Sequence, residues 1–567
     1  MPRTYKGKNL ASIISFVNKR ITIPLLEINR PRRIYGIIYV IWIPFPLFGR
    51  NGQYSKSDLM GLMQTIAAID VGSNAIRLMI GKVDENSHLE PLESLRVPVR
   101  LGKDTFHNGN GIISEASMQE TVNAFNTFQK VIHDYGVSQF RAVSTSAMRE
   151  AANQEILIDR ILQATGIPVE VISGEEEARL IHLAVSKVIE LQNYVALLVD
   201  IGGGSMETTL SVDGNIVFAE SFKIGAVRLL NQLNQAEKPA LSFQELVREF
   251  IESPLRRLQK ILQDQPVNLL VSTGGNVETL GELAHKLFLR KTSQVLSLGD
   301  LEMLIERLEN TSFEDRIHQL GLRPDRADVI LPAAILLKSV AVETHQTEIA
   351  IPRVSLKDGV LWDLAEEIIP GTHLSRREQV WVSIQHLGSK YGMDEGHSRH
   401  VSDLASSIFD QTRPLHALAP EYRLLLEAAA YLHDIGHFIS TIDHDKHGYY
   451  ILTANPLIGL TDAQQAMLAT MVRFHRRQQP SLEDPAFRLL QQKDRLVVMK
   501  LLSILRIADG LDTNRSGRVK QISMKNERAA WELDLSGEGD LLLEKWTADK
   551  RKSLFCELFG VTLDIKD

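Results

Sequence analysis

The stretch "AIDVGSNAIRLMI", residues 68–80, decides the fold. An apolar run reaches Asp70, turns at Gly72 among small polar residues, and continues as a second apolar run that carries Arg77. The stretch "LVDIGGGSMETTL", residues 198–210, repeats this order. Apolar runs on both sides of a glycine turn are typical of a β-hairpin. Two related hairpins predict two related lobes, with a cleft between them where both turns meet one ligand.

The composition indicates a globular protein with several domains. Of its 567 residues, 44% are hydrophobic and 23% are charged, close to the averages for globular proteins. The length allows three or four domains. The formal charge of −7 gives no overall attraction to nucleic acid, so we expect no nucleic-acid partner, and an anionic ligand must meet a local basic cleft. The single cysteine, Cys556, excludes an internal disulfide and fits a cytoplasmic, reducing compartment.

The first residues, 1–62, differ from the rest of the chain. They are rich in Lys and Arg, contain only Glu27 and Asp58 as acids, and include the apolar stretch "IYGIIYVIWIPFPLF". This stretch is shorter than the roughly 20 apolar residues that span a bilayer, so we expect no transmembrane span. We expect a poorly ordered leader or an upstream extension. Peripheral membrane contact through this leader is the alternative.

The rest of the chain divides by its periodicity. Short β-type runs alternate with helical segments in the first part, which predicts α/β lobes around mixed sheets. We expect lobe I at residues 63–188 and lobe II at 189–372. Helical periodicity then dominates, which predicts an all-α domain at 376–515. The alternating pattern after it predicts a small α+β cap at 516–567.

The two glycine turns are suited to hold phosphate. Successive glycines let backbone N–H groups converge on an anion, because no Cβ blocks the approach. Nearby carboxylates are hard oxygen ligands for Mg²⁺, and a guanidinium can take a pair of phosphate oxygens. An ordinary tight hairpin would explain one such turn but not the pair. The residues expected at the phosphate are Gly72, Ser73, Asn74, Arg77, Gly202, Gly203, Gly204 and Ser205, and those expected at the cation are Asp70, Asp200 and Glu207.

Two further motifs place hydroxyls and glycines at strand-to-helix transitions. "STSAMRE" carries Ser146 and Arg149 at the start of a helix, where free N–H groups and the helix dipole favour anions. A simple helix cap is the alternative for this motif. "STGGNVETL" carries Gly274 and Gly275, which we expect to form the floor of the cleft on the second lobe.

The acidic run in "VISGEEEARL" leaves one carboxylate without a structural role. Ser173 and Glu176 have the spacing of a capping box, and Glu175 can pair with Arg179 one turn later. Neither role uses Glu177. A carboxylate near a phosphate cleft can orient and deprotonate an attacking water, so Glu177 is a candidate general base. A solvated surface acid is the alternative.

Five motifs carry a family resemblance. "AIDVGSNAIRLMIGKV", "STSAMREAAN", "VISGEEEARL", "LLVDIGGGSMETTL" and "STGGNVETL" resemble, in order and spacing, the exopolyphosphatase and guanosine pentaphosphate phosphatase family. The resemblance covers residues 65–369 and implies two actin-like (ribonuclease H-like) lobes. It implies that Glu177 is the catalytic base and that Asp200 and Glu207 take part in Mg²⁺ binding. It also implies that residues 202–205 cradle the phosphates and that Arg149 contacts the phosphate chain.

The resemblance leaves the substrate open. Family members often carry Ser-Phe-His after the first turn, where this chain has Ala-Ile-Arg and therefore Arg77. The expected reaction is Mg²⁺-dependent release of a terminal phosphate from inorganic polyphosphate, with guanosine pentaphosphate as the alternative substrate. Dimers are common in the family, so we expect a homodimer. A kinase of the same superfold would need an acceptor site, for which we find no signature, and an actin-like filament would assemble with ATP and release little phosphate.

Histidine is concentrated in the expected helical domain. Eight of the seventeen histidines lie between His397 and His475. Imidazoles and carboxylates in a helical bundle can bind one or two divalent transition metals and activate water. The order H, HD, H, H, D of these residues along the chain resembles the HD phosphohydrolase domain, over residues 379–512. The candidate ligands are His397, His433, Asp434, His447, His475 and Asp509, whereas His400, His416, His437 and His444 are expected at the surface or in packing.

The activity of this domain stays open at the level of sequence. In exopolyphosphatases the attached HD-like domain is often degenerate and extends the substrate channel. The retained ligand set allows an active centre instead, and even the principal one, with the first two lobes acting as a sensor.

Overall fold

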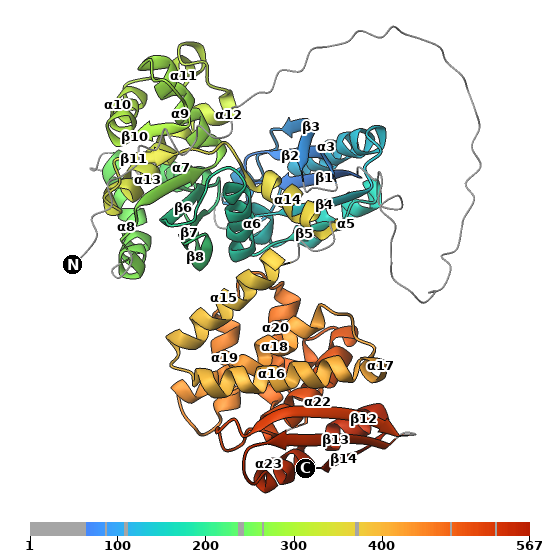
Figure 1. Cartoon of the computed structure of the whole chain (residues 1–567). Coiled ribbons are helices and arrows are strands. Elements are labelled where there is room, and N and C mark those ends of the chain that lie inside the picture. The colour runs from blue at the N-terminus through green and yellow to red at the C-terminus, as the bar shows by residue number, and fades with distance from the viewer. Residues whose placement is uncertain are drawn as a thin grey trace, which may run out of the picture.

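A computed structural model describes residues 64–566, apart from the internal segments 85–87, 107–110, 236–242, 263–265, 369–373, 477–478 and 528–529. The leader expected at 1–62 lies outside the described residues. No helix in the described part of the chain combines the length and the apolar character that a membrane crossing requires. Figure 1 shows two α/β lobes beside each other, with a helical part below them and a small sheet at its far side.

The first sheet has the strand order β3-β2-β1-β4-β5. The predicted hairpin joins β1 and β2, which are antiparallel, and places Asp70 opposite Arg77. β4 and β5 continue the sheet in parallel with β1. The strands are β1 (Gln64–Val71), β2 (Ile76–Val83), β3 (Leu89–Val97), β4 (Gln139–Ser144) and β5 (Val169–Val171).

Both faces of this sheet are buried, which explains why β1 is almost continuously apolar. Successive side chains of a strand point to opposite faces. Ala67 and Ile69 belong to a core that includes aromatic side chains of α3, whereas Ile66 and Ala68 belong to a core that includes Leu180 of α6. The helices of this region are α2 (Leu101–Thr105), α3 (Glu115–Asp134), α4 (Ser146–Arg149), α5 (Gln154–Thr165) and α6 (Gly174–Ser186).

The second sheet has the order β10-β11-β9-β6-β7-β8 and contains the second predicted hairpin. β6 and β7 are antiparallel and place Asp200 opposite Glu207, the same register as Asp70 and Arg77 in the first sheet. β9 lies parallel to β6 on the other side. The strands are β6 (Val195–Ile201), β7 (Met206–Val212), β8 (Asn215–Phe222), β9 (Leu269–Thr273), β10 (Val295–Ser297) and β11 (Glu348–Ala350).

Helices complete the second lobe. α13 (Ile330–Glu343) is apolar on nearly all sides and is buried over most of its length. The other helices in this part of the chain are α7 (Ala226–Gln235), α8 (Phe243–Leu262), α9 (Gly275–Leu287), α10 (Leu298–Glu309), α11 (Phe313–His318) and α12 (Pro324–Ala327).

One helix within the range expected for lobe II, residues 189–372, packs on the first lobe. The last helix of the α/β part, α14 (Leu356–Ile368), packs on β1 and α6 of the first lobe, although it follows the second lobe in sequence. Val360 and Leu361 of α14 are buried against Ala68 of β1 in one core. A Cβ at Gly359 would lie 2.0 Å from the carbonyl oxygen of Leu180, so this glycine permits the close approach. Lobe I is therefore built from two separate pieces of chain.

The helical part follows directly. Its bundle contains α15 (Leu374–Lys390), α16 (Glu395–Gln411), α17 (Arg413–His416), α18 (Tyr422–Leu432), η2 (Ile435–Phe438), α19 (His444–Ala454), α20 (Asp462–Phe474), α21 (Pro485–Arg488) and α22 (Gln492–Gly510).

A three-stranded sheet ends the described chain, in the order β12-β13-β14. Leu533 of this sheet shares one hydrophobic core with Leu501 of α22 and Ile408 of α16. The part of the chain for which a cap is expected therefore shares its core with the helical part. Its elements are β12 (Val519–Glu527), β13 (Ala530–Gly537), α23 (Leu542–Arg551), α24 (Ser553–Phe559) and β14 (Thr562–Lys566).

Candidate active site

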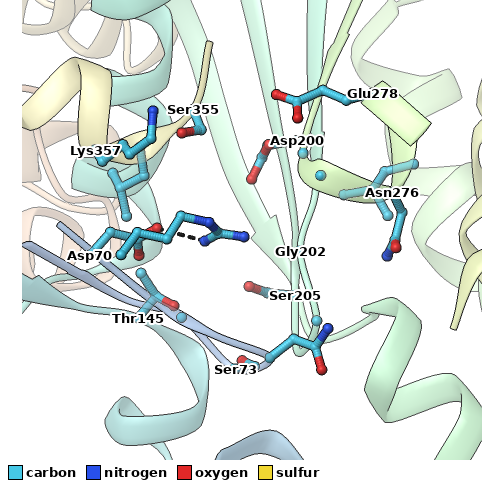
Figure 2. A pocket seen from close by; sticks show the side chains of 18 of the residues that line it. Asp70, Ser73, Thr145, Asp200, Gly202, Ser205, Asn276, Glu278, Ser355 and Lys357 are labelled. Atoms are coloured by element: carbon cyan, nitrogen blue, oxygen red, sulfur yellow. Dashed lines mark hydrogen bonds and ion pairs between the residues drawn. The ribbon is translucent and has the colours of Figure 1, made fainter. Parts of the chain in front are cut away.

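A cleft of about 350 Å³ lies where the two hairpins meet (Figure 2). Close packing of the hairpins requires glycine, because a Cβ at Gly203 would lie 2.9 Å from the Cβ of Ser73 in the other lobe. The expected phosphate residues that line this cleft are Gly72, Ser73, Asn74, Arg77, Ser146, Gly202, Gly203, Ser205, Gly274 and Gly275.

Two of the expected phosphate residues do not line the cleft. Gly204 is packed closely, since a Cβ there would lie 2.2 Å from the ring of Phe106 and 2.5 Å from Oγ of Ser146. Arg149 sits behind the cleft wall, where its Nη1 donates to the carbonyl of Ile172 at 2.7 Å and lies 3.6 Å from Oε2 of Glu177. Its side chain therefore faces Glu177 and is positioned to influence that carboxylate.

Three carboxylates cluster at the cleft: Glu177 and Asp200 line it, whereas Glu207 is buried beside them and does not line it. Glu177 comes from the first turn of α6, Asp200 from the end of β6 and Glu207 from the start of β7. One oxygen from each lies within 4.8 Å of the others. Asp70 takes a different partner: its Oδ2 accepts from Nη1 of Arg77 at 2.8 Å. The structure therefore groups two of the three expected cation ligands with the candidate base.

The first turn of α6 explains the orientation of Glu177. Ser173 caps the helix and accepts from the N–H of Glu176 at 3.2 Å, which is one half of the predicted capping box. The expected pairing of Glu175 with Arg179 is wrong, because Arg179 binds Glu176 at 2.7 Å and Asp363 at 2.8 Å. Glu177 is thereby left to point into the cleft, with 6% of its surface exposed.

Burial dominates the electrostatics of these acids. It raises the pKa of Glu177 well above its ordinary value; the charge of Glu207 adds to this effect and Arg149 opposes it. Burial also raises the pKa of Glu207 to about 7, with Asp200 adding to it. The pKa of Asp200 is raised to about 6 by burial, against a hydrogen bond from Thr273.

The unsatisfied oxygens among these acids fit a divalent cation. Oε2 of Glu177 and Oε2 of Glu207 are buried and have no hydrogen-bond partner among the described residues. Two other oxygens accept hydrogen bonds: Ser221 donates to Oε1 of Glu207 at 2.8 Å, and Thr273 donates to Oδ1 of Asp200 at 2.5 Å. Buried carboxylates without donors are costly unless a cation or a proton neutralises them. Oxygen-only donors match the preference of Mg²⁺.

The cleft also has cationic side chains that no sequence motif indicated. Arg96, Arg326 and Lys357 also line it and come from three separate segments. Burial lowers the pKa of Arg326 to about 10, and the charge of Arg323 adds to the effect. Like charges held this close favour an anionic ligand. No local motif marks these residues, because only the tertiary fold brings them together.

A second cluster lies in the helical part, around a cavity of about 340 Å³. The structure brings together five of the six expected metal ligands: His397, His433, Asp434, His475 and Asp509. His447 is the exception, since it is half-buried on α19 and does not line this cavity. His437 and His444, expected at the surface or in packing, both lie 3.3 Å from Oδ1 of Asp434.

Two further histidines of this region, His416 and His400, lie outside the cluster. His416 is buried, and its Nε2 contacts the carbonyl oxygen of Phe409 at 2.9 Å, which is a packing role. His400 is half-buried and does not line the cavity.

Family models match most of the described chain. The model of the Ppx/GppA phosphatase family matches residues 79–368, and the model of domain III of the Ppx/GppA phosphatases matches 381–547. The chain belongs to the Ppx/GppA phosphatase family. This Ppx/GppA protein is therefore a hydrolase that acts on phosphoanhydride bonds.

Relatives with two different names match this Ppx/GppA chain. It is 25% identical over 448 residues to a guanosine-5'-triphosphate,3'-diphosphate pyrophosphatase of Photobacterium profundum, covering 77% of this chain and 86% of that protein. It is 25% identical over 329 residues to exopolyphosphatase 1 of Mycobacterium tuberculosis, covering 57% of this chain and 95% of that protein. The crystal structure of an exopolyphosphatase from Cytophaga hutchinsonii matches with a TM-score of 0.51 and 28% identity, covering 54% of this chain and 99% of that chain. These likenesses fit a fold of two actin-like lobes.

Proposed function

We propose that this chain hydrolyses the terminal phosphate of inorganic polyphosphate in the cleft between the two lobes, with Glu177 as general base. The observation that carries the proposal is a buried carboxylate oxygen, Oε2 of Glu177, that has no hydrogen-bond donor among the described residues and sits at the edge of a glycine-lined cleft. An acid held in this way is available to accept a proton from water.

Asp200 and Glu207 are the proposed ligands of Mg²⁺. Their raised pKa values and the free Oε2 of Glu207 support a cation at this position. When bound, Mg²⁺ would supply positive charge to the phosphate oxygens and relieve the repulsion among the acids.

Side chains and backbone groups of the protein bind the substrate and activate the water. The N–H groups of Gly72 and Gly202 donate within their own hairpins, so other backbone N–H groups of the two turns and the guanidinium of Arg77 bind the phosphate oxygens. Glu177 orients a water for in-line attack. The new bond joins the water oxygen to the terminal phosphorus, the bond to the bridging oxygen breaks, and Glu177 takes the proton of the water. Arg149, 3.6 Å from Glu177, favours the ionised form of that carboxylate.

Guanosine pentaphosphate is the second candidate substrate. The likeness to the Photobacterium profundum pyrophosphatase supports it, and the same residues would remove its terminal phosphate to leave the tetraphosphate. Arg77 stands where family members often carry histidine, and it leaves the choice between the two substrates open. The homodimer, the cytoplasmic location, a peripheral membrane contact and the exact domain limits stay predictions.

Phosphate release tests the proposal. Long-chain polyphosphate and guanosine pentaphosphate would be compared with purified protein in Mg²⁺ and in EDTA, and the products separated by ion-exchange chromatography. We expect stepwise loss of terminal phosphate that stops in EDTA and in the Glu177→Gln variant. Cleavage within the polyphosphate chain, or full activity in EDTA, would contradict the proposal.

A further inference from the structure

Arg228, in the first turn of α7, contacts three other residues with one side chain. Its Nε donates to the carbonyl oxygen of Gly204 at 2.7 Å, and its Nη2 donates to Oε1 of Glu150 at 2.6 Å. Its guanidinium also lies over the ring of Phe106, with Cζ 4.1 Å from the ring centroid. A guanidinium can make these contacts together, because its donors are fixed in one plane and its face stacks on an aromatic ring.

The partners of Arg228 come from both lobes. Gly204 lies in the glycine turn of the second lobe, whereas Glu150 follows α4 and Phe106 follows α2, two helices of the first lobe. The side chain of Arg228 is 13% exposed, so the link between the lobes is largely shielded from solvent. None of these four residues lines the cleft, so a ligand in the cleft does not meet them.

The start of α7 holds the same glycine turn through its backbone. The N–H groups of residues 226–228 donate to the carbonyl oxygens of Gly202 and Gly203 at 2.8–3.0 Å. With the bond from Arg228 to Gly204, three successive carbonyl oxygens of the turn are bound by α7. The turn therefore has little freedom, and α7 sets the direction in which its remaining N–H groups point.

The other end of the link leads to the candidate base. Glu150 directly follows Arg149, whose Nη1 lies 3.6 Å from Oε2 of Glu177. Ser146, at the start of the same helix, lines the cleft, and its Oγ lies 3.0 Å from Oγ of Ser73 in the first hairpin. Because α4 has only four residues, a displacement of Glu150 also displaces Arg149 or Ser146.

The proposed reaction depends on how these two ends are aligned. The glycine turn of the second lobe binds the terminal phosphate, whereas Glu177 of the first lobe orients the attacking water. Their relative position is set by the contacts between the lobes. A misplacement of about 1 Å between reacting groups can slow a reaction about 10²-fold.

We propose that Arg228 is a positioning residue, which keeps the glycine turn of the second lobe aligned with Arg149 and Glu177 of the first. Arg228 acts through Gly204 and Glu150 and does not itself contact the substrate. This inference rests on the proposed function, because the alignment matters only if the turn and Glu177 act on one phosphate.

Single-turnover phosphate release from long polyphosphate tests this role. With enzyme in excess over chain ends and with Mg²⁺, we expect Arg228→Met to lower the rate constant about 10²-fold. An inactive fraction would lower only the amount of phosphate released, so a role in stability alone would leave this rate constant at its wild-type value. KM should change less than about threefold, because Arg77 and the other phosphate contacts remain.

A conservative variant separates the geometry of Arg228 from its charge. Arg228→Lys can still pair with Glu150, but one ammonium group cannot also replace the bond to Gly204 and the stacking on Phe106. We expect its rate constant to be lower than that of wild type by about tenfold or more. Adding Glu150→Gln to Arg228→Met should slow release no further, because both changes break the same link.

The matched control is Arg290→Met. Arg290 donates to both carboxylate oxygens of Asp300 within the second lobe, and neither residue lines the cleft. This variant loses an arginine–carboxylate pair without touching the link, so it should release phosphate at the wild-type rate.

Hydrogen–deuterium exchange measures the link without relying on activity. We expect amides in peptides covering residues 146–151 and 200–206 to exchange faster in Arg228→Met than in wild type, and at the wild-type rate in Arg290→Met. Should wild type release no phosphate, the proposed function fails, while this measurement still decides whether Arg228 holds the turn.

Three results would overturn the inference. The first is a wild-type rate constant in folded Arg228→Met or Arg228→Lys, alongside an active wild type. The second is an equal loss of rate in Arg290→Met, which would indicate a general effect on the second lobe. The third is unchanged exchange of both peptides in Arg228→Met.

Discussion

The carboxylates of the cleft lie beside one another and are buried or half-buried, so their protonation should control cation binding. The pKa of Glu207 is raised to about 7 and that of Asp200 to about 6. Both are ionised at pH 8, whereas Glu207 is mostly protonated at pH 6, and a cation must then displace the proton. We expect Mg²⁺ to bind roughly 10- to 20-fold more weakly at pH 6 than at pH 8, as measured by calorimetry.

The control for this pH dependence is Glu207→Gln. This variant should bind Mg²⁺ weakly at both pH values, because it lacks one of the two proposed ligands. It also lacks the carboxyl group with the higher pKa, since the pKa of Glu207 is above that of Asp200. Equal Mg²⁺ affinity of wild type at pH 6 and pH 8 would show that these acids do not hold the cation.

Arg77 both neutralises Asp70 and lines the cleft. Arg77→Met removes a phosphate contact and leaves the buried Asp70 unpaired and negative, facing an anionic substrate. We expect KM to rise at least tenfold for whichever substrate is used. Asp70→Asn combined with Arg77→Met should recover part of this loss, which a double-mutant cycle measures. An unchanged KM in the single variant would remove Arg77 from the phosphate site.

Local patterns identified some site residues and not others. The place of the glycine turns and of Glu177 at the cleft was predictable, because residues adjacent in the sequence determine each turn and the capped start of the helix. His444 and His447 both lie on α19, and sequence spacing alone does not tell which one faces Asp434. Arg326 and Lys357 were missed since they come from distant segments and reach the cleft only through the tertiary fold.

At the scale of elements, a buried ion-pair network joins α6, β4 and α14. Asp363 of α14 binds Arg179 of α6 at 2.8 Å and Arg141 of β4 at 2.7 Å, and both Asp363 and Arg179 are almost fully buried. Removing one partner leaves uncompensated buried charge. We expect Asp363→Ala to lower the free energy of unfolding by about 3–5 kcal/mol, as measured by urea denaturation.

A matched surface pair provides the control for this network. Glu252 and Arg256 form an exposed ion pair on α8. Glu252→Gln should change the free energy of unfolding by less than about 0.5 kcal/mol. Similar effects of the two substitutions would mean that the buried network adds no more than a surface pair.

Most helices and strands could be predicted from the hydrophobic periodicity of the sequence, but the way they pack together could not. The alternation of β-type runs and helices predicted both sheets and their hairpins. The return of α14 to the first lobe could not be read from its sequence, because an apolar helix face does not say which sheet it will cover. The corrected pairing of Arg179 has the same cause: its partner Asp363 is supplied by that returning helix.

At the scale of the molecule, ion pairs join the two lobes near the cleft. Arg96 of the first lobe pairs with Asp325, and Arg100 pairs with Asp328 at 2.8 Å. Asn74 also donates to the carbonyl of Asp325 at 2.9 Å. Because each lobe has buried side chains of its own, these pairs should set the opening of the cleft more than the stability of either lobe.

Removing both carboxylates tests this role. We expect Asp325→Ala combined with Asp328→Ala to give a larger radius of gyration by small-angle X-ray scattering in the absence of substrate. The melting temperature should change by only a few degrees. An unchanged scattering profile would show that other contacts hold the lobes together.

The central claim is that Glu177 activates water in the cleft, and single-turnover phosphate release from long polyphosphate measures it most directly. At saturating enzyme and Mg²⁺, Glu177→Gln should slow phosphate release by about 10²–10⁴-fold, while substrate binding measured separately changes less than about threefold. Glu175→Gln, in the same helical turn, should react at the wild-type rate. Release at the wild-type rate in Glu177→Gln would contradict the account.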